Sequence, residues 1–511
     1  MNIPCSRRRF LLAGGIALMA PRLWAKPLFA ADPFSLGVAS GAPLPDGIVL
    51  WTRLAPEPLN GGGLPAMGIE VRWEIAHDEG FRHIAQTGQI RAEPADAHSL
   101  HVEVRGLQPA RWYWYRFMAG NAVSATGRTR TAPAAGAPLD RLRFAFASCQ
   151  QYEQGFYAAH RHLAAEDLDL VVFLGDYIYE SSWGRNHVRR HEGAEPTTLE
   201  QYRNRYARYK SDADLQKSHA AFPWIVTWDD HEVDNDYAND RSEDLDPDFL
   251  VRRAAAYQAY WEHMPLRHTA RPDGPHMLLY GRHDFGSLAQ FHVLDGRQYR
   301  DHQVCPKAGR GGSNLIDDTR CPGRRDPRLT LLGKAQEDWL YAGFSASSAR
   351  WNIVAQQTLM AQMSRRPGTQ AQFWTDGWDG YPAARHRLLA TIAERRPANP
   401  LMIGGDVHFN CVADLKADFD DPKAPILATE FCGTSITSQG PAQARLDAQR
   451  ADNPHVRFAN SEKRGYALLE LSARRCLAPL RVIDSEKSTA AAISTLAAFV
   501  VEDGRPGAGA A

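Results

Sequence analysis

The sequence predicts an α/β domain with parallel strands, preceded by an all-β domain. Residues 142–148 and 170–174 are apolar runs typical of buried parallel strands, and the segment between them repeats apolar residues at helical spacing. Residues 33–133 instead consist of short alternating segments separated by Gly, Pro and Asp, a pattern typical of a β-sandwich. Reactive side chains directly follow the candidate strands of the α/β part. Because the carboxyl ends of parallel strands border one crevice, we expect these side chains to meet.

The chain is long enough for more than one domain. It has 511 residues, whereas single hydrophobic cores rarely grow beyond about 250–300 residues. The run TAPAAGAP at 131–138 is typical of a linker. We therefore predict a leader over residues 1–31, a β-sandwich domain over 32–135, an α/β domain over 140–485 and a tail over 486–511. The tail is rich in Ala and then in Gly, so we expect it to fray.

Residues 6–11 and the apolar run after them resemble a twin-arginine export signal. The segment Ser-Arg-Arg-Arg-Phe-Leu precedes an apolar stretch that is too short to cross a bilayer as a stable helix. Small residues at Ala25, Ala30 and Ala31 offer cleavage points. We expect the twin-arginine translocase to be a partner during export, and the periplasm or the medium to be the destination. A basic N-terminal anchor is the alternative.

The charge balance restricts the classes of partner. Lys plus Arg number 59 and Asp plus Glu also number 59, so the formal net charge is zero. A chain without excess charge has no overall field that would attract it to nucleic acid or to an anionic membrane. We therefore expect no nucleic-acid-binding surface and no stable membrane span, and an anionic substrate has to be held by local groups.

The cysteines are too few for a disulfide scaffold. There are seven in the whole chain. Cys305 and Cys321 lie in a long polar segment, residues 297–327, and are candidates for a bridge in an oxidising compartment. Cys411 and Cys432 are assigned structural roles.

The candidate strand ends together present a set of metal-binding groups. Several carboxylates crowded at one crevice repel each other unless a cation neutralises them. Oxygen ligands suit Ca²⁺, whereas a thiolate, an imidazole and a phenolate beside a shared carboxylate suit a transition metal, of which iron is our first choice. Taken alone, a Cys or Tyr after a strand is more often a packing residue. The set comprises Cys149, Asp176, Tyr179, Asp229, Asp230, His231, Gln357, Asp406 and His408.

Three blocks carry a resemblance to a known family. Gly-Asp-x-x-Tyr at 175–179, Asp-Asp-His-Glu at 229–232 and Gly-Asp-x-His at 405–408 resemble blocks of the calcineurin-like metallophosphoesterases. More narrowly, the chain is similar to the PhoD-type alkaline phosphatases, and the segments 146–150 and 376–381 are among the most specific matches. The resemblance implies an immunoglobulin-like domain joined to a metallophosphatase sandwich of mixed sheets flanked by helices. It also implies a twin-arginine leader, and Fe³⁺ and Ca²⁺ as cofactors.

The chain departs from the purple acid phosphatase pattern at three positions. Cys149 stands where an Asp-x-His block begins, Asp230 replaces an Asn, and Gln357 replaces a His. Apart from the Cys, these changes favour oxygen ligands and therefore Ca²⁺ at one of the metal positions.

We therefore predict a secreted phosphoesterase in which Asp176 bridges the metals and a metal-bound hydroxide attacks phosphorus in line. His231 is the candidate for the leaving-group acid or the transition-state hydrogen bond, and Asp229 is a second catalytic candidate. Arg385 is assigned to solvent rather than to phosphate. An alkaline phosphatase acting on small phosphate esters is the first choice. A phosphodiesterase acting on teichoic acids, nucleotides or phospholipids, and a calcium-dependent surface-binding protein, are the alternatives. The predicted metal ligands are Cys149, Asp176, Tyr179, Asp230, Gln357, Asp406 and His408.

Overall fold

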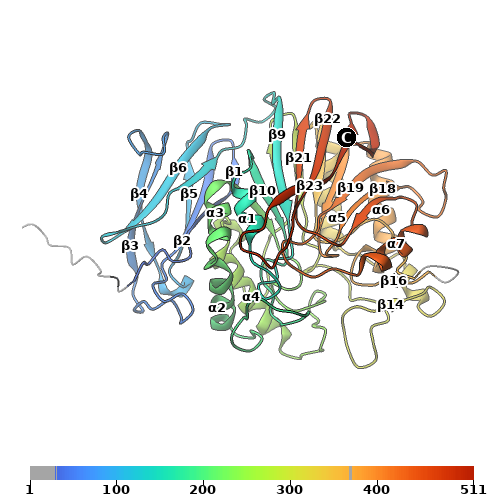
Figure 1. The fold of residues 1–511 in the computed structure, drawn as a ribbon, viewed down its shortest axis with the longest axis horizontal. Helices are drawn as coiled ribbons and strands as arrows, with labels where there is room; N and C mark the ends of the chain where they lie inside the picture. Colours follow the sequence, from blue (N-terminus) through green and yellow to red (C-terminus); the bar gives the residue numbers. More distant parts are fainter. Residues whose placement is uncertain (1–28, 30, 367–370) are drawn as a thin grey trace, which may run out of the picture.

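The computed structural model describes residue 29, residues 31–366 and residues 371–511. The predicted leader, residues 1–31, lies almost entirely outside the described residues. Within the described part, none of the helices has both the length and the apolar character needed to cross a membrane. The N-terminal strands, blue in Figure 1, form a lobe at one end of a larger body.

Two large sheets make up the centre of the molecule. One has ten strands in the order β24 (Arg505–Ala510), β23 (Ile493–Glu502), β22 (Arg475–Ile483), β21 (Arg464–Ser472), β9 (Arg141–Ala147), β10 (Leu170–Leu174), β11 (Pro223–Thr227), β1 (Val38–Leu44), β2 (Gly47–Arg53) and β5 (Ser99–Arg105). The other has seven strands in the order β12 (Gly281–Phe285), β13 (Ala289–Val293), β15 (Trp351–Ala355), β17 (Pro400–Gly404), β19 (Ile426–Cys432), β18 (Asn410–Lys416) and β20 (Val456–Asn460).

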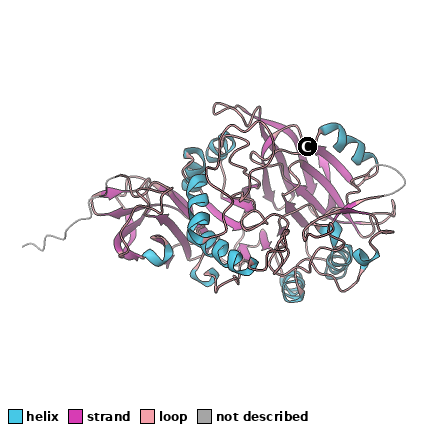
Figure 2. Ribbon diagram, turned by 90° about the horizontal axis from the view of Figure 1, so that it is seen from below, coloured by secondary structure: helices cyan, strands magenta, loops and turns pink. Residues whose placement is uncertain are grey.

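Helices cover the outer faces of the two sheets, as the turned view in Figure 2 shows. The ten-stranded sheet packs on α1 (Ala158–Ala164), α2 (Leu199–Lys210), α3 (Ala213–Ala221) and α4 (Phe249–His263). The seven-stranded sheet packs on α5 (Lys334–Ala346), α6 (Pro382–Arg395) and α7 (Gln443–Ala451). Four short 3-10 turns are described: η1 (Pro94–Asp96), η2 (His268–Ala270), η3 (Pro322–Arg325) and η4 (Trp378–Gly380).

The two sheets bury both faces of their central strands, which explains the continuous apolar runs in the sequence. In β9, Leu142, Phe144 and Phe146 face the seven-stranded sheet, whereas Ala145 and Ala147 face the helices. Strands β9, β10 and β11 are parallel, and so are β13, β15, β17 and β19. This four-layer α/β/β/α arrangement is the predicted sandwich of mixed sheets flanked by helices.

The N-terminal β-sandwich shares a sheet with the rest of the chain. Strands β1, β2 and β5 pack on a five-stranded sheet formed by β4 (Ile84–Ala92), β3 (Ile69–Ala76), β6 (Trp112–Ala119), β7 (Ala122–Val123) and β8 (Gly127–Arg130). β1 also pairs in parallel with β11 through Ser40 and Gly41. A Cβ on Gly41 would lie 2.6 Å from the Pro265 carbonyl oxygen, so glycine permits this close approach. The linker at 131–138 therefore does not separate two independent sheets.

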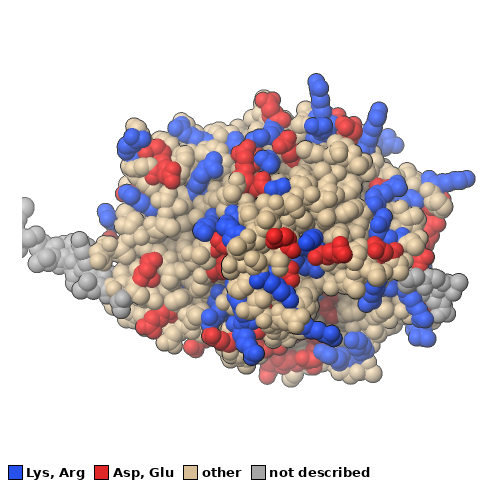
Figure 3. Space-filling model, viewed as in Figure 1, with Lys and Arg blue, Asp and Glu red and all other residues tan. Residues whose placement is uncertain are grey.

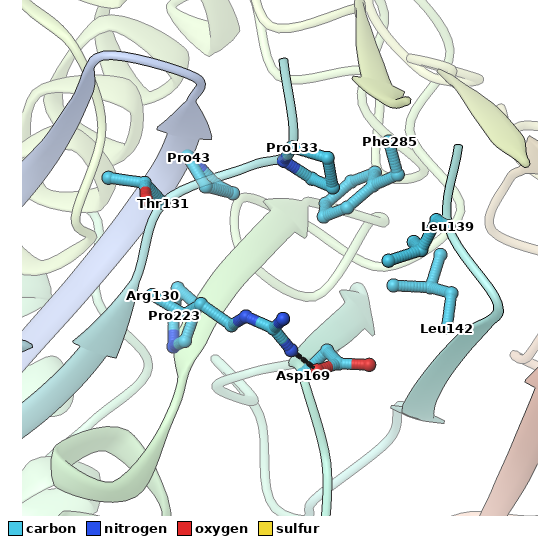
Figure 4. A pocket seen from close by; sticks show the side chains of 9 residues that line it. All are labelled: Pro43, Arg130, Thr131, Pro133, Leu139, Leu142, Asp169, Pro223 and Phe285. Atoms are coloured by element: carbon cyan, nitrogen blue, oxygen red, sulfur yellow. Dashed lines mark hydrogen bonds and ion pairs between the residues drawn. The ribbon is translucent and has the colours of Figure 1, made fainter. Parts of the chain in front are cut away.

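The junction between the two parts is tightly filled. Figure 4 shows Pro43 and Pro133 lying near Phe285, with the Arg130–Asp169 ion pair beside them. The cavity that these side chains leave has a volume of about 10 Å³, which is close to the space that one water needs. The N-terminal lobe is therefore fixed by packing as well as by strand pairing.

The long polar segment 297–327 is cross-linked. Cys305 and Cys321 form a disulfide, which confirms the predicted pairing, and Cys411 and Cys432 are free and buried. A short two-stranded sheet of β14 (Leu315–Ile316) and β16 (Phe373–Trp374) further anchors the segment.

The prediction that the C-terminal tail frays is wrong. Strands β23 and β24 extend the ten-stranded sheet beyond β22, and β24 lies beside β19 and β18. Phe499 and Val501 point into the core between the two large sheets. The Ala-rich and Gly-rich composition suggested disorder. It did not reveal that Phe499 and Val501 alternate as core residues, or that β22 offers an edge with which β23 pairs.

We expect Phe499→Ala to lower the free energy of unfolding by about 3 kcal/mol, because it removes a buried aromatic ring from this core. Ser494→Ala, on an exposed position of the same strand, should change the free energy of unfolding by less than about 0.5 kcal/mol. Urea unfolding followed by tryptophan fluorescence measures both. Equal midpoints for the two variants would mean that the tail contributes nothing to the fold.

Candidate metal centre

The residues at the predicted strand ends share an unusual backbone conformation. Cys149 after β9, Asp176 after β10, and Asp406 and His408 after β17 have φ angles of 59°, 55°, 63° and 59°. Non-glycine residues rarely adopt this left-handed region, at a cost of about 1–3 kcal/mol each. Such strained residues cluster at functional sites, where the surrounding structure holds them in place. These strand ends therefore combine a strained backbone conformation with polar side chains, as functional sites often do.

A first group of donors joins both sheets. One ligand atom from each of Cys149, Asp176 and His408 lies within 4.8 Å of the others. Tyr179 completes the group, because its hydroxyl donates to Asp176 Oδ2 at 2.8 Å and lies 3.2 Å from His408 Nε2. The structure thus brings together a thiol, a phenol, an imidazole and a carboxyl from the ends of three strands, β9, β10 and β17. Burial lowers the pKa of His408 to about 3, so its imidazole is neutral and can act as a ligand.

A second group lies beside the first and shares a residue with it. Asp176, Asp230 and His231 also present ligand atoms within 4.8 Å of one another. His231 Nδ1 lies 2.7 Å from Glu180 Oε2, which leaves Nε2 as the nitrogen available to the site. The His231 ring packs on the Tyr179 ring with their centroids 4.1 Å apart. Asp176 belongs to both groups, as a bridging carboxylate would.

Arg297 neutralises a third acidic group. Asp230, Asp236 and Asp376 have carboxylate oxygens within 4.8 Å of one another. The buried Arg297 guanidinium lies 2.7 Å from Asp376 and 3.5 Å from Asp230, and its Nε donates to Asp229 Oδ1. A guanidinium thus already supplies the positive charge here, so this third group does not need a metal ion.

In the first group, the carboxyl, the thiol and the phenol all resist ionisation. Burial raises the pKa of Asp176 well above its ordinary value, and the carboxylates of Asp230 and Asp229 raise it further, against the opposing effect of His231. Burial, with the Asp176 charge, also raises the pKa values of Cys149 and Tyr179. These groups resist ionisation until a cation stabilises their charged forms. This crowding contrasts with the surface in Figure 3, where basic and acidic side chains are interspersed.

Two orphaned oxygens support the same conclusion. Asp176 Oδ1 and Asp229 Oδ2 are buried and have no hydrogen-bond partner. Buried carboxylate oxygens are normally satisfied, and an unsatisfied one calls for an explanation such as an ion. Together with the mixed sulfur, nitrogen and oxygen donors, these atoms fit metal ions at the first two groups.

Glu232 ties two of the strand ends together. Its carboxylate accepts hydrogen bonds from the backbone N–H groups of Asp176, at 3.0 Å, and Asp229, at 2.8 Å, and also from that of Tyr177. The left-handed turn at Asp176 therefore has its amide satisfied by a residue of the loop that follows the neighbouring strand, β11.

Gln357 follows β15, and its amide is engaged in hydrogen bonds. Its Oε1 accepts from the Gly296 N–H at 3.0 Å, and its Nε2 donates to Thr227 Oγ1 at 3.0 Å and to the Leu294 carbonyl at 2.7 Å. The amide cross-links strand ends of the two sheets, so its structural role is established by these bonds and its role as a ligand stays a prediction. A strand-end position alone could not distinguish these two roles.

Asp406 and Arg385 are both engaged by neighbouring side chains. Asp406 Oδ2 accepts from Thr358 Oγ1 at 2.5 Å, and burial together with Asp376 and Asp230 raises the pKa of Asp406 to about 6. Its carboxylate stands beside the two compact groups, not within them. Arg385 is buried against Asp379 at 2.6 Å, so its assignment to solvent was wrong.

Sequence reasoning missed several polar residues that hold the site together. Glu232 and Asp376 lie within motifs that it had already singled out. Arg297 lies after the end of β13, and Glu180 directly follows Tyr179 after β10. Their position after a strand could therefore have identified both. Ser438 and Thr358 lie in loops without a recognisable motif. The missed residues are Glu180, Glu232, Asp236, Arg297, Thr358, Asp376 and Ser438.

Comparisons with known proteins identify the family. The PhoD-like phosphatase family model matches residues 144–480, and the model of that family's N-terminal domain matches residues 20–133. The chain belongs to the PhoD-like phosphatase family. Alkaline phosphatase D of Bacillus subtilis (strain 168) is 47% identical over 496 residues, which are 94% of this chain and 83% of that protein. A solved structure of PhoD superposes with a TM-score of 0.90 at 47% identity, covering 95% of this chain and 93% of its own.

Membership in the PhoD-like phosphatase family makes the chain a phosphoric ester hydrolase whose substrates are phosphate esters. The predicted family, fold class and enzyme class are therefore confirmed. The alternative of a non-enzymatic surface-binding protein is set aside.

We expect Arg297→Met to lower the free energy of unfolding of the metal-free protein by about 3–5 kcal/mol, because it leaves buried carboxylates without their cation. Arg350→Met is the control, since Arg350 pairs with Asp503 at the surface and such pairs contribute about 0–1 kcal/mol. Denaturant unfolding in the presence of a chelator measures both. A wild-type midpoint for Arg297→Met would contradict the compensating role.

Proposed function

We propose that this chain is a metal-dependent alkaline phosphatase with one Fe³⁺ and Ca²⁺ in adjacent positions. The observation that carries the proposal is the pair of donor groups sharing Asp176. The soft and covalent donors Cys149, Tyr179 and His408, with Asp176, suit iron. Asp176 and Asp230, with Asp406 and the free oxygen of Asp229 close by, suit Ca²⁺.

When bound, the metal ions activate the attacking water and stabilise the charge of the pentacoordinate transition state. The chain's own residues supply the proton and the alignment. Glu180 holds His231 by Nδ1, so that an Nε2–H can protonate the oxygen of the departing alcohol. Arg297 fixes the carboxylate of Asp229 through Oδ1 and leaves the buried Oδ2 without a hydrogen-bond partner. His408 Nδ1 donates to the Gln439 carbonyl at 2.9 Å, which fixes Nε2 as the ligand atom.

We also propose export through the twin-arginine translocase to the periplasm or the medium. The support is the Ser-Arg-Arg-Arg-Phe-Leu segment at 6–11 and the Cys305–Cys321 disulfide, which suits an oxidising compartment. Folded export also suits a protein whose metal site is built from strands far apart in the sequence.

Metal analysis combined with paired substrates tests the proposed function. The purified full chain should contain iron and calcium, and EGTA should remove calcium and abolish turnover while iron stays bound. A phosphomonoester and a phosphodiester with the same leaving group should be assayed side by side. Faster hydrolysis of the diester would favour the phosphodiesterase alternative. Full activity in a preparation free of iron and calcium would overturn the metal assignment.

Asp176→Asn should lose both metals, because the shared carboxylate separates the two cations and contributes charge to each. We expect iron and calcium contents to fall well below one per chain and turnover to be lost. Asp420→Asn, an exposed residue in a loop after β18, is the control and should keep its metals. Wild-type metal content and activity in Asp176→Asn would refute the bridge.

His231→Gln should slow hydrolysis of alkyl phosphates by about 10²–10⁴-fold, whereas p-nitrophenyl phosphate should be much less affected because its leaving group needs no proton. Glu180→Gln should show the same selectivity at about 10–100-fold, since it only orients the imidazole. Glu192→Gln, at an exposed position, should leave both rates unchanged. A uniform loss over both substrates in His231→Gln would instead assign His231 to metal binding.

A further inference from the structure

Ser438 is a buried hydroxyl in contact with the soft donor group. It lies in the loop after β19 and is fully inaccessible to solvent. Its Oγ lies 2.8 Å from Tyr179 Oη and 2.8 Å from the Cys149 carbonyl oxygen. The backbone N–H of Gln151 donates to the same Oγ at 3.2 Å, which fixes the position of the oxygen.

The Ser438 hydroxyl has one proton and two possible acceptors. The Cys149 carbonyl already accepts from the backbone N–H groups of Ser438, at 3.2 Å, and of Thr437, at 3.4 Å. It therefore does not depend on the hydroxyl. A tyrosine that ligates a metal is a phenolate, and a charged oxygen is a stronger acceptor than a carbonyl. The Ser438 proton is accordingly directed to Tyr179.

The loop that carries Ser438 is rigidly attached to the strand end below it. Thr437 Oγ1 donates to the Gln151 carbonyl at 2.8 Å, and the Ile436 N–H donates to the Ser148 carbonyl at 3.0 Å. The position of Ser438 is therefore set by one side-chain and one backbone hydrogen bond between the loop and the strand end, in addition to the bond from the Gln151 N–H.

We infer that Ser438 is a positioning residue that holds the Tyr179 phenolate on iron and tunes the reduction potential of that iron. The inference rests on the proposed assignment of iron to Tyr179. A hydrogen bond to a ligand oxygen withdraws electron density from it, so the ligand stabilises the ferric state less. Ser438 thus sets how strongly the phenolate donates to the metal, without touching the substrate.

The test is made on the full-length iron-containing protein by redox titration and visible spectroscopy. Ser438→Ala should retain iron but shift the midpoint potential to more negative values and move the tyrosinate charge-transfer band. Ser438→Thr, which keeps the hydroxyl, should stay near the wild type. Ser438→Cys, with a weaker donor, should shift the potential less than Ser438→Ala in the same direction. A wild-type potential and spectrum in Ser438→Ala would overturn the inference.

Two controls separate this effect from a general disturbance of the loop. Thr437→Ala removes a neighbouring anchor that does not contact Tyr179, and the backbone bonds from Ile436 and Gln151 still hold the loop, so it should leave the potential unchanged. In a Tyr179→Phe background, Ser438→Ala should produce no further shift, because the coupled partner is absent. An additional shift there would assign the effect to another ligand and refute the inference. Wild-type protein without iron, or with iron but without the band, would overturn the proposed iron site and this inference together.

Discussion

The repulsion among buried carboxylates at one edge of two sheets is the constraint on which the rest of the structure depends. Asp176, Asp229 and Asp230 lie where burial opposes their ionisation. Arg297 compensates one side of this cluster, and the orphaned oxygens of Asp176 and Asp229 mark the side that it does not reach. The fold therefore divides the task between a built-in guanidinium and the metal ions that we propose.

The sandwich explains how such crowding can arise. Each sheet contributes parallel strands, and the carboxyl ends of β9, β10 and β11 face those of β13, β15 and β17. Cross-links between the two sets, such as Gln357 to Thr227 and Arg297 to Asp229, hold the edges in register. Polar side chains at these ends thus have two roles, since some carry chemistry while others keep the two sheets together.

The hydrophobic pattern predicted the central strands because both of their faces are buried. Their position at strand ends identified Cys149, Asp176 and His408 as candidate site residues. The same rule did not reveal the hydrogen bonds of Gln357, because the partners of its amide lie far away in the sequence. Ser438 was missed for the same reason: its contact with Tyr179 joins residues 259 positions apart. Local signals locate the site, whereas the supporting residues are determined by tertiary packing.

The difference between the two donor groups gives a physical reason for two kinds of metal ion. Burial raises the pKa values of Cys149 and Tyr179, so both groups lose their protons only if a cation stabilises the anions. A highly charged ion stabilises them better than Ca²⁺ does. Asp230, by contrast, has its pKa held below the ordinary value despite burial, by Arg297 and His231, and is ionised without a metal. A weakly polarising ion suffices there. On the proposed assignment, Asp176 couples the two positions, so iron bound by the first group leaves a pre-formed carboxylate for the second.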